Sequence, residues 1–324
     1  MTAAPVPLTQ EPAEGPGTSG PAGPRRSGRG TRALGPLLAL PGMVWLALFF
    51  LAPLYVVLAV VFGGVDPVFR TVIPVWNPLQ WSSDQPQYVV THIVGEDAIF
   101  GPALLRTAVY VLSASVLCLL IAFPIAYYVA RLAGRWRGLL LALLIAPFWI
   151  SYMMRMLAWV NLLANDGLVN RIVSLGGFLP GDTDWLSGHS TVVILGLVYG
   201  YVPYMIIPLY AGLDRLPTSL VESARDLGAS RTSAFWRVTL PMARPIVVAS
   251  VLLTCLPMLG DYFTSDLLSG SPRTSMVGNL INETVLTPGQ TGQAGAFVLL
   301  VLLVSLLSML YYVRSVSRND GATM

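Results

Sequence analysis

The most regular feature of the sequence is a series of long apolar runs separated by polar connections. A helix that crosses a bilayer needs about 20 predominantly apolar residues, and each run is long enough to provide one. Prolines inside the runs predict kinks, which membrane helices tolerate when neighbouring groups satisfy the freed carbonyls. We therefore expect six spans, at residues 37–63, 103–130, 139–164, 190–213, 246–268 and 294–313.

Composition agrees with an all-α, multi-pass membrane protein. Of the 324 residues, 55% are hydrophobic and only 11% are charged, whereas soluble domains carry about 25% charged residues. The first run, 37–63, is too long for the apolar region of a secretory signal, so we expect it to remain as a membrane anchor. The remaining segments are predicted as a disordered tail (1–36), an external loop (64–102), a five-helix domain (103–313) and a C-terminal tail (314–324).

The placement of arginine predicts the orientation of the chain. All 19 basic residues are Arg; fourteen lie in connections on the side of the N-terminal tail, four lie on the other side, and Arg155 lies within the third run. Cytoplasmic connections carry the excess of basic residues in membrane proteins. We therefore expect both termini, and the connection at 214–245, to be cytoplasmic.

The side-chain inventory argues against several kinds of chemistry. The chain has no Lys, which a P-loop requires for its phosphates and Schiff-base catalysis requires for its amine. Its two histidines, His92 and His189, lie far apart in the sequence, so we expect neither a metal site nor a set of catalytic residues.

One connection between two spans is charged and is interrupted by glycine: "ESARDLGASRTSAFWRVTLPMARP", residues 222–245. Ser219 and Glu222 match a capping box at a helix start, and Gly228 matches a left-handed helix end. A second short helix is expected from Ser230. An apolar stripe along the first helix allows two interpretations: a helix lying on lipid headgroups, or a docking element for a cytosolic partner.

The spacing in this connection resembles the EAA loop of ABC-importer permeases, which has E-A-A, three residues, G, nine residues and I-x-L-P. Two positions depart from that pattern, with Ser in place of the second residue and Val in place of Ile. Three other stretches, 147–163, 165–172 and 259–270, resemble the spermidine/putrescine permease subunits. The matching positions of the loop are Glu222, Ser223, Ala224, Gly228, Val238, Leu240 and Pro241.

The resemblance implies a function and a set of partners. The loop would be a coupling helix seated on a separate cytosolic ABC ATPase dimer, which binds ATP and Mg²⁺, so this chain would be neither an enzyme nor a cofactor-binding protein. A second, homologous permease subunit and an extracytoplasmic solute-binding protein would complete a complex in a bacterial cytoplasmic membrane, without nucleic acid. The implied solute is a polyamine, with iron, phosphonate or another small solute as the alternative.

Ionisable residues within spans are candidates for the substrate path. Arg155 and Asp261 are placed at similar depth, so they could pair and lock two helices together. Alternatively Asp261, with its aromatic neighbour Tyr262, could recognise a cationic amine. Trp149 and Tyr152 are further candidates, although aromatic residues in such positions are more often packing or interfacial anchors.

Three other functions remain to be compared with an importer subunit. An ion-coupled secondary transporter would typically show internal repeats and carboxylates in mid-span, which we do not find. A membrane enzyme would need a nucleophile and base at one depth. A receptor or scaffold is compatible with the composition but leaves the loop spacing unexplained.

Overall fold

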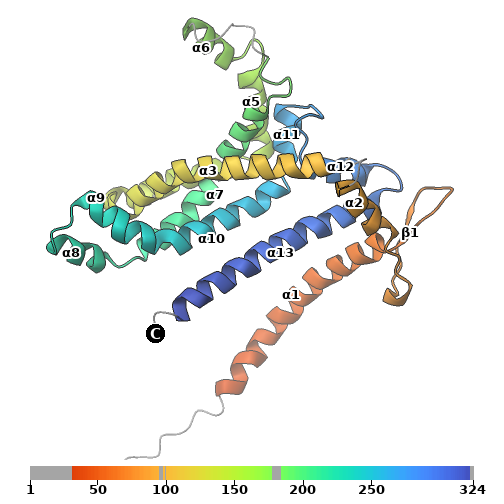
Figure 1. Cartoon of the computed structure of the whole chain (residues 1–324), viewed down its shortest axis with the longest axis horizontal. Coiled ribbons are helices and arrows are strands. Elements are labelled where there is room, and N and C mark those ends of the chain that lie inside the picture. The colour runs from red at the N-terminus through yellow and green to blue at the C-terminus, as the bar shows by residue number, and fades with distance from the viewer. Residues whose placement is uncertain (1–30, 95–97, 99, 177–183, 322–324) are drawn as a thin grey trace, which may run out of the picture. The chain divides into compact units, whose positions relative to one another are not determined.

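The computed structural model of the protein describes residues 31–94, 98, 100–176 and 184–321 (Figure 1). The chain divides into two units, Met1–Pro53 and Leu54–Met324. Helix α1, Thr31–Val61, begins in the first unit and ends in the second. It starts within the segment expected to be a tail, so residues 31–36 are helical; the rest of that segment lies outside the described residues.

A small folded region follows α1, where the sequence predicts only an external loop. Strands β1 (Gly64–Val65) and β2 (Val72–Ile73) pair antiparallel. A 3₁₀ turn, η1 (Pro78–Gln80), and helix α2 (Asp84–Val94) come next. The N–H of Val75 donates to the carbonyl of Ala59 (2.9 Å), so this region folds back against the end of α1.

Helices form almost all of the remaining chain. They include the π-helical turn η4, which joins α9 to α10 without a break in the helical backbone. In chain order the elements are α3 (Gly101–Arg131), η2 (Gly134–Trp136), α4 (Arg137–Ile145), η3 (Ala146–Trp149), α5 (Tyr152–Leu163), α6 (Leu168–Gly176), α7 (Ser190–Asp214), α8 (Thr218–Asp226), α9 (Arg231–Ala234), η4 (Phe235–Thr239), α10 (Leu240–Leu259), α11 (Phe263–Leu268), α12 (Val277–Leu286) and α13 (Thr291–Gly321).

The core of the second unit is the contact between α3 and α7, with α10 packed beside them (Figure 1). Small residues recur every four positions along α3, at Ala114, Cys118, Ala122 and Ala126, and all four are fully buried. Residues four apart share one face of a helix, and small side chains let two membrane helices approach closely. Large side chains of α7 therefore pack directly against the backbone of α3.

The predicted all-α, multi-pass fold is confirmed, but the number of spans is less definite. Five helices are long and apolar enough to cross a membrane. A sixth span is obtained only if 134–149 and 152–175 are taken together, and these two segments meet at an angle of 84°. The run 139–164, which is expected to be one span kinked at its proline, is therefore two helices separated by a break. Pro147 ends the regular α4 backbone, and Ile150 is extended, so the chain turns before α5.

The C-terminal helices pack along the same bundle. The N–H of Val277, at the start of α12, donates to the Thr107 hydroxyl of α3 (2.8 Å). At the other end of α13, the hydroxyl of Tyr312 donates to the carbonyl of Pro245 (2.9 Å). Helix α13 continues to Gly321, so most of the segment expected to be a C-terminal tail, 314–324, is helical.

Candidate functional site: the loop between α7 and α10 and the break in the third span

The loop between α7 and α10 contains two short helices that meet at a glycine. Helix α8 ends at Asp226, and Gly228 follows with φ +90°, a backbone conformation that residues with a Cβ adopt only at a cost. Ser230 caps α9, its hydroxyl accepting from the N–H of Ser233 (3.2 Å). The predicted pair of helices and the left-handed glycine are confirmed.

The predicted capping box is wrong. Helix α8 begins two residues earlier than the pattern requires, at Thr218, and the residue before it is Pro217, which makes no side-chain capping bond. Ser219 and Glu222 therefore lie within the first turns of the helix rather than at its cap and third position. Glu222 is exposed, as is Ser223, and Ala224 is half-buried.

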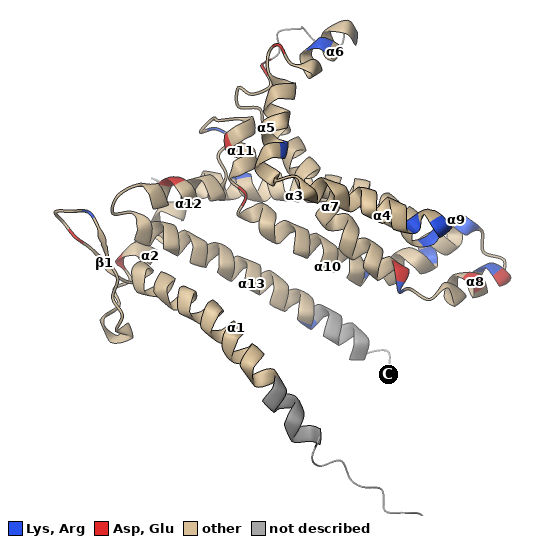
Figure 2. Ribbon diagram, turned by 180° about the vertical axis from the view of Figure 1, so that it is seen from behind, with Lys and Arg blue, Asp and Glu red and all other residues tan. Residues whose placement is uncertain are grey.

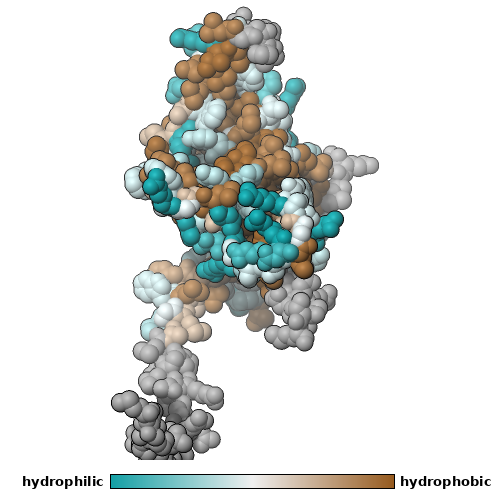
Figure 3. Space-filling view, turned by 90° about the vertical axis from the view of Figure 1, so that its left-hand side faces the viewer, coloured by the Kyte–Doolittle hydropathy of each residue, from teal (hydrophilic) through white to brown (hydrophobic). Residues whose placement is uncertain are grey.

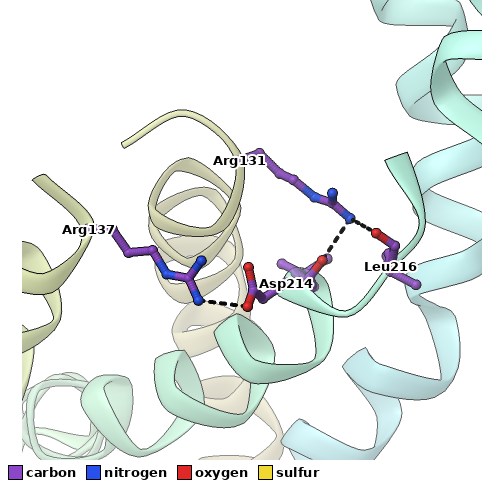
Figure 4. Close-up of polar contacts among 5 residues, drawn as sticks. Arg131, Arg137, Asp214 and Leu216 are labelled. Carbon is purple, nitrogen blue, oxygen red and sulfur yellow. Dashed lines mark hydrogen bonds and ion pairs between the residues drawn. The ribbon is translucent and has the colours of Figure 1, made fainter. Parts of the chain in front are cut away.

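The start of the loop is held by two arginines, one from the end of α3 and one from the start of α4 (Figure 4). Arg131, in the last turn of α3, donates from Nη2 to the carbonyls of Leu213 (2.8 Å) and Leu216 (2.7 Å). Arg137, at the start of α4, pairs with Asp214 (2.6 Å). The last carbonyls of a helix have no partner within the helix, so Arg131 satisfies groups that the end of α7 leaves open.

The end of the loop is attached to α3 by aromatic packing. The ring of Phe235 lies edge-on to that of Tyr127, with centroids 5.3 Å apart, and it also packs against Phe123. The half-buried Val238 lies within the π-helical turn, while Leu240 and Pro241 form the first residues of α10. Because the helical backbone continues from the π-helical turn into α10, Pro241, which has no N–H, leaves one carbonyl of the preceding turn without its usual donor.

The outward face of the loop combines charged residues with one exposed leucine. Leu227 is 90% exposed at the turn between the helices. A groove of about 390 Å³ separates the loop from the end of α3; its lining includes Tyr127, Arg131, Glu222, Arg225 and Arg231. Arginines gather around α4 and α9, and α8 carries both signs of charge (Figure 2). Viewed end-on, this end of the bundle is largely hydrophilic (Figure 3).

The second group of candidate residues lies at the break in the third span. Asp261 follows α10, is 6% exposed, and accepts from the hydroxyls of Tyr152 (2.7 Å) and Thr264 (2.6 Å). Its other oxygen accepts from the Thr264 N–H (3.1 Å). A Cβ at Gly200 would lie 2.7 Å from the Tyr152 ring, so only glycine lets this ring pack against α7. Three helices therefore meet at Asp261.

The predicted ion pair between Arg155 and Asp261 is wrong. Within the described residues no ion pair joins these two side chains, whereas Arg137 does pair with Asp214. The guanidinium of Arg155 instead lies over the rings of Tyr152 (5.4 Å) and Phe148 (6.0 Å). Arg155 is 6% exposed, and its buried Nε has no hydrogen-bond partner in the described structure. The side chain is therefore buried within the protein.

The other two candidates are not brought together with Asp261. Trp149 is 87% exposed at the end of η3. The ring of Tyr262 stacks on Phe263 (centroids 4.1 Å apart), and its carbonyl accepts from the Asn279 side chain (3.1 Å). Within the described residues, no group of three or more His, Cys, Asp or Glu side chains is placed to hold a metal ion.

A family model for the binding-protein-dependent transport system inner membrane component matches residues 122–319, which include α7, the loop and α10. The chain belongs to this family. Membership agrees with a multi-pass protein of the bacterial inner membrane, and it places the loop 214–245 within the matched region.

Curated relatives of this transport component include the spermidine/putrescine permease protein PotB of Haemophilus influenzae, 37% identical over 173 residues. PotB of Escherichia coli K12 is 35% identical over 185 residues. These alignments cover 53% and 57% of this chain and 60% and 66% of the relatives. The chain thus spans less than two thirds of the length of either relative.

Solved structures agree with this family assignment at the level of the fold. A bacterial ABC transporter involved in the import of alginate has a chain with a TM-score of 0.64 and 20% identity, covering 89% of this chain and 96% of its own. A chain of the MetNI methionine ABC transporter has a TM-score of 0.52 and 16% identity, covering 67% and 94%.

Sequence reasoning missed the residues that hold this inner membrane component's loop in place. Arg131 and Arg137 entered the sequence analysis only among the arginines of the charge bias, and Asp214 only as the first residue of the connection 214–245. Their contacts were missed because their partners lie about 80 positions away along the chain. Leu227 is part of the apolar stripe predicted along the first helix of the loop, and such a stripe does not show which of its residues stays exposed to solvent. The basic residue in the last turn of α3, Arg131, is the one signal that pointed to such a contact.

Proposed function

We propose that the protein is a permease subunit of an ATP-driven ABC importer, and that its loop 214–245 docks on a separate ATPase subunit. The observation that carries the proposal is the loop itself. Two short helices turn at Gly228, present Leu227 outward, and are held at both ends by α3. A partner that pushes on this turn would move α7 and α10 together, because both helices continue directly from the loop.

The solute that we propose is a polyamine of the spermidine and putrescine type. The support comes from the names of the relatives and from Asp261, a carboxylate at the junction of α5, α7 and α11. A cationic amine would replace the hydroxyl donors that now surround this carboxylate. Another small solute, such as iron or a phosphonate, remains the alternative that uptake competition must test.

The remaining parts of the proposal concern assembly and orientation. Both termini and the loop face the cytoplasm, in keeping with the arginine bias. A homologous permease subunit completes the path, a solute-binding protein delivers the solute from outside, and ATP with Mg²⁺ is bound by the ATPase rather than by this chain. The names and titles of relatives and neighbours support partners of these kinds.

The first experiment tests the ATPase partner. The tagged chain is purified in mild detergent from its own host, and the proteins that accompany it are identified by mass spectrometry. We expect a P-loop ATPase with the wild type and a marked loss of it with Leu227→Asp. The matched control is Leu286→Asp, which alters an exposed leucine at the end of α12. Equal recovery with all three proteins would refute docking through the loop.

The second experiment tests the solute. Uptake of labelled spermidine is measured in cells that express the complete transporter, in competition with unlabelled putrescine, ferric iron or a phosphonate. Inhibition by putrescine alone supports the polyamine assignment. Inhibition by one of the other solutes, or no spermidine uptake by a complex that contains the ATPase, contradicts it.

A further inference from the structure

The small folded region between α1 and α2, residues 64–83, carries four large apolar side chains on its outside. Val68 is 79% exposed, Phe69 77%, Trp76 55% and Leu79 93%. We call these four residues the apolar rim. They belong to a region that the predicted function does not use, and its only charged residues are one Asp and one Arg.

The region is held in one conformation by its own hydrogen bonds. Asp66 accepts from the N–H groups of Val68 (2.8 Å) and Phe69 (2.9 Å), which fixes the tip of the hairpin. The indole of Trp81 donates to the carbonyl of Val75 (2.9 Å) and stacks on Phe62, with centroids 5.0 Å apart. The rim is therefore presented by a folded segment rather than by a flexible loop.

Hydrogen bonds to α1 fix the depth of the region. The hydroxyl of Tyr55 donates to the carbonyl of Trp76, and the N–H of Ser82 donates to the carbonyl of Phe62 (3.0 Å). Tyr55 precedes Val61, the last residue of the span, by six positions, or about 9 Å along the helix. The N–H of the adjacent Val75 bonds to Ala59, two positions before Val61. Trp76 thus lies beside the last two turns of the span, within about 9 Å of its end.

The same region lies at the end of the bundle away from the loop 214–245. A Cβ at Gly289, just before α13, would touch Arg70 and Val65. The opposite end of α13 contacts Pro245, where the loop joins α10. The region is therefore at the membrane face opposite the loop.

We propose that residues 64–83 form an interfacial anchor in the leaflet opposite the loop, with the apolar rim inserted among the lipid headgroups and upper acyl chains. The depth set by Tyr55 places Trp76 where tryptophan is favoured, at the boundary between headgroups and hydrocarbon. The two charges of the region are of opposite sign, so it offers no charged surface to a protein partner. The region would bind the bilayer because its apolar side chains are buried there, away from water.

The test measures where a label at position 79 lies in the bilayer. In a Cys118→Ala, Cys255→Ala background, nitroxide labels are placed by Leu79→Cys, by Leu303→Cys on the lipid face of α13, and by Gln87→Cys on the polar side of α2. The chain is reconstituted in phosphatidylcholine nanodiscs, and collision with oxygen and with a water-soluble nickel chelate is measured. We expect position 79 to favour oxygen, as position 303 does.

The other outcomes overturn the proposal. Greater accessibility to nickel, as at position 87, places the rim in water. Low accessibility to both reagents places it against protein. A second measurement keeps the native cysteines, in case their replacement prevents folding. Brominated lipid should quench a larger fraction of the tryptophan fluorescence in the wild type than in Trp76→Phe. An equal quenched fraction in the two proteins would place Trp76 away from lipid.

Discussion

Arg131, in the last turn of α3, donates a hydrogen bond to the carbonyl of Leu216, the second residue after α7 (2.7 Å). The same nitrogen also donates a hydrogen bond to the carbonyl of Leu213 (2.8 Å). One side chain from α3 therefore determines where the chain leaves α7 and enters the loop. The neighbouring pair, Arg137–Asp214, is partly exposed to solvent, with side chains 43% and 33% exposed.

The first prediction compares these two arginines. Arg131→Met should lower the free energy of unfolding by about 1 to 3 kcal/mol, because it leaves two helix-end carbonyls without their donor. Arg137→Met should cost less than about 1 kcal/mol, since an exposed ion pair contributes little. Thermal unfolding in detergent measures both variants, and an equal or reversed order would show that Arg131 does not hold the loop.

The second prediction concerns the backbone at Gly228. No atom lies within 4 Å of a Cβ built at this position, so a substitution acts through φ +90° alone. Gly228→Val should reorganise the turn at a cost of about 1 to 2 kcal/mol and reduce recovery of the ATPase. Gly228→Asn, which tolerates left-handed backbone, should retain most of it. Equal loss in both variants would mean that side-chain size rather than conformation matters.

The third prediction separates the charge of Asp261 from its structural bonds. Asp261→Asn keeps the shape but removes the charge, and we expect it to reduce polyamine uptake while the complex still assembles. Tyr152→Phe removes one donor to the same carboxylate, at a cost of about 1 to 2 kcal/mol in stability, and should leave uptake largely intact. If Asp261→Asn transports with unchanged kinetics, the residue has only a structural role.

The fourth prediction is a pH dependence in the hairpin that carries the apolar rim. The N–H groups of Phe69 and Val68 hold the pKa of Asp66 below its usual value. The ionised carboxylate therefore stabilises the hairpin fully above the ordinary aspartate pKa of about 3.9. This stabilisation is lost as the pH falls through the lowered pKa. A nitroxide at Thr71→Cys should become more mobile over that range.

The control for this pH effect is Asp66→Asn, which can still accept both hydrogen bonds but does not titrate. In that variant the mobility of the label should stay constant through the acid range. An identical acid response in the presence and absence of the carboxylate would assign the transition to another group.

The sequence alone determined the fold class, the approximate positions of five spans, and the geometry of the loop around Gly228. These features are local: apolar run length predicts a span, and a glycine after a helical stripe predicts a left-handed turn. The local argument failed at Ser219: the helix begins at Thr218, two residues earlier than a cap at Ser219 requires.

Only the tertiary structure decided which distant side chains meet. Equal depth predicted that Arg155 would pair with Asp261, yet depth does not fix the direction in which a side chain points. The break at 149–152 turns α5 by 84° and brings Tyr152, rather than Arg155, to the carboxylate. Likewise the partners of Arg131 follow from the packing of α3 on α7, which no local pattern of residues determines.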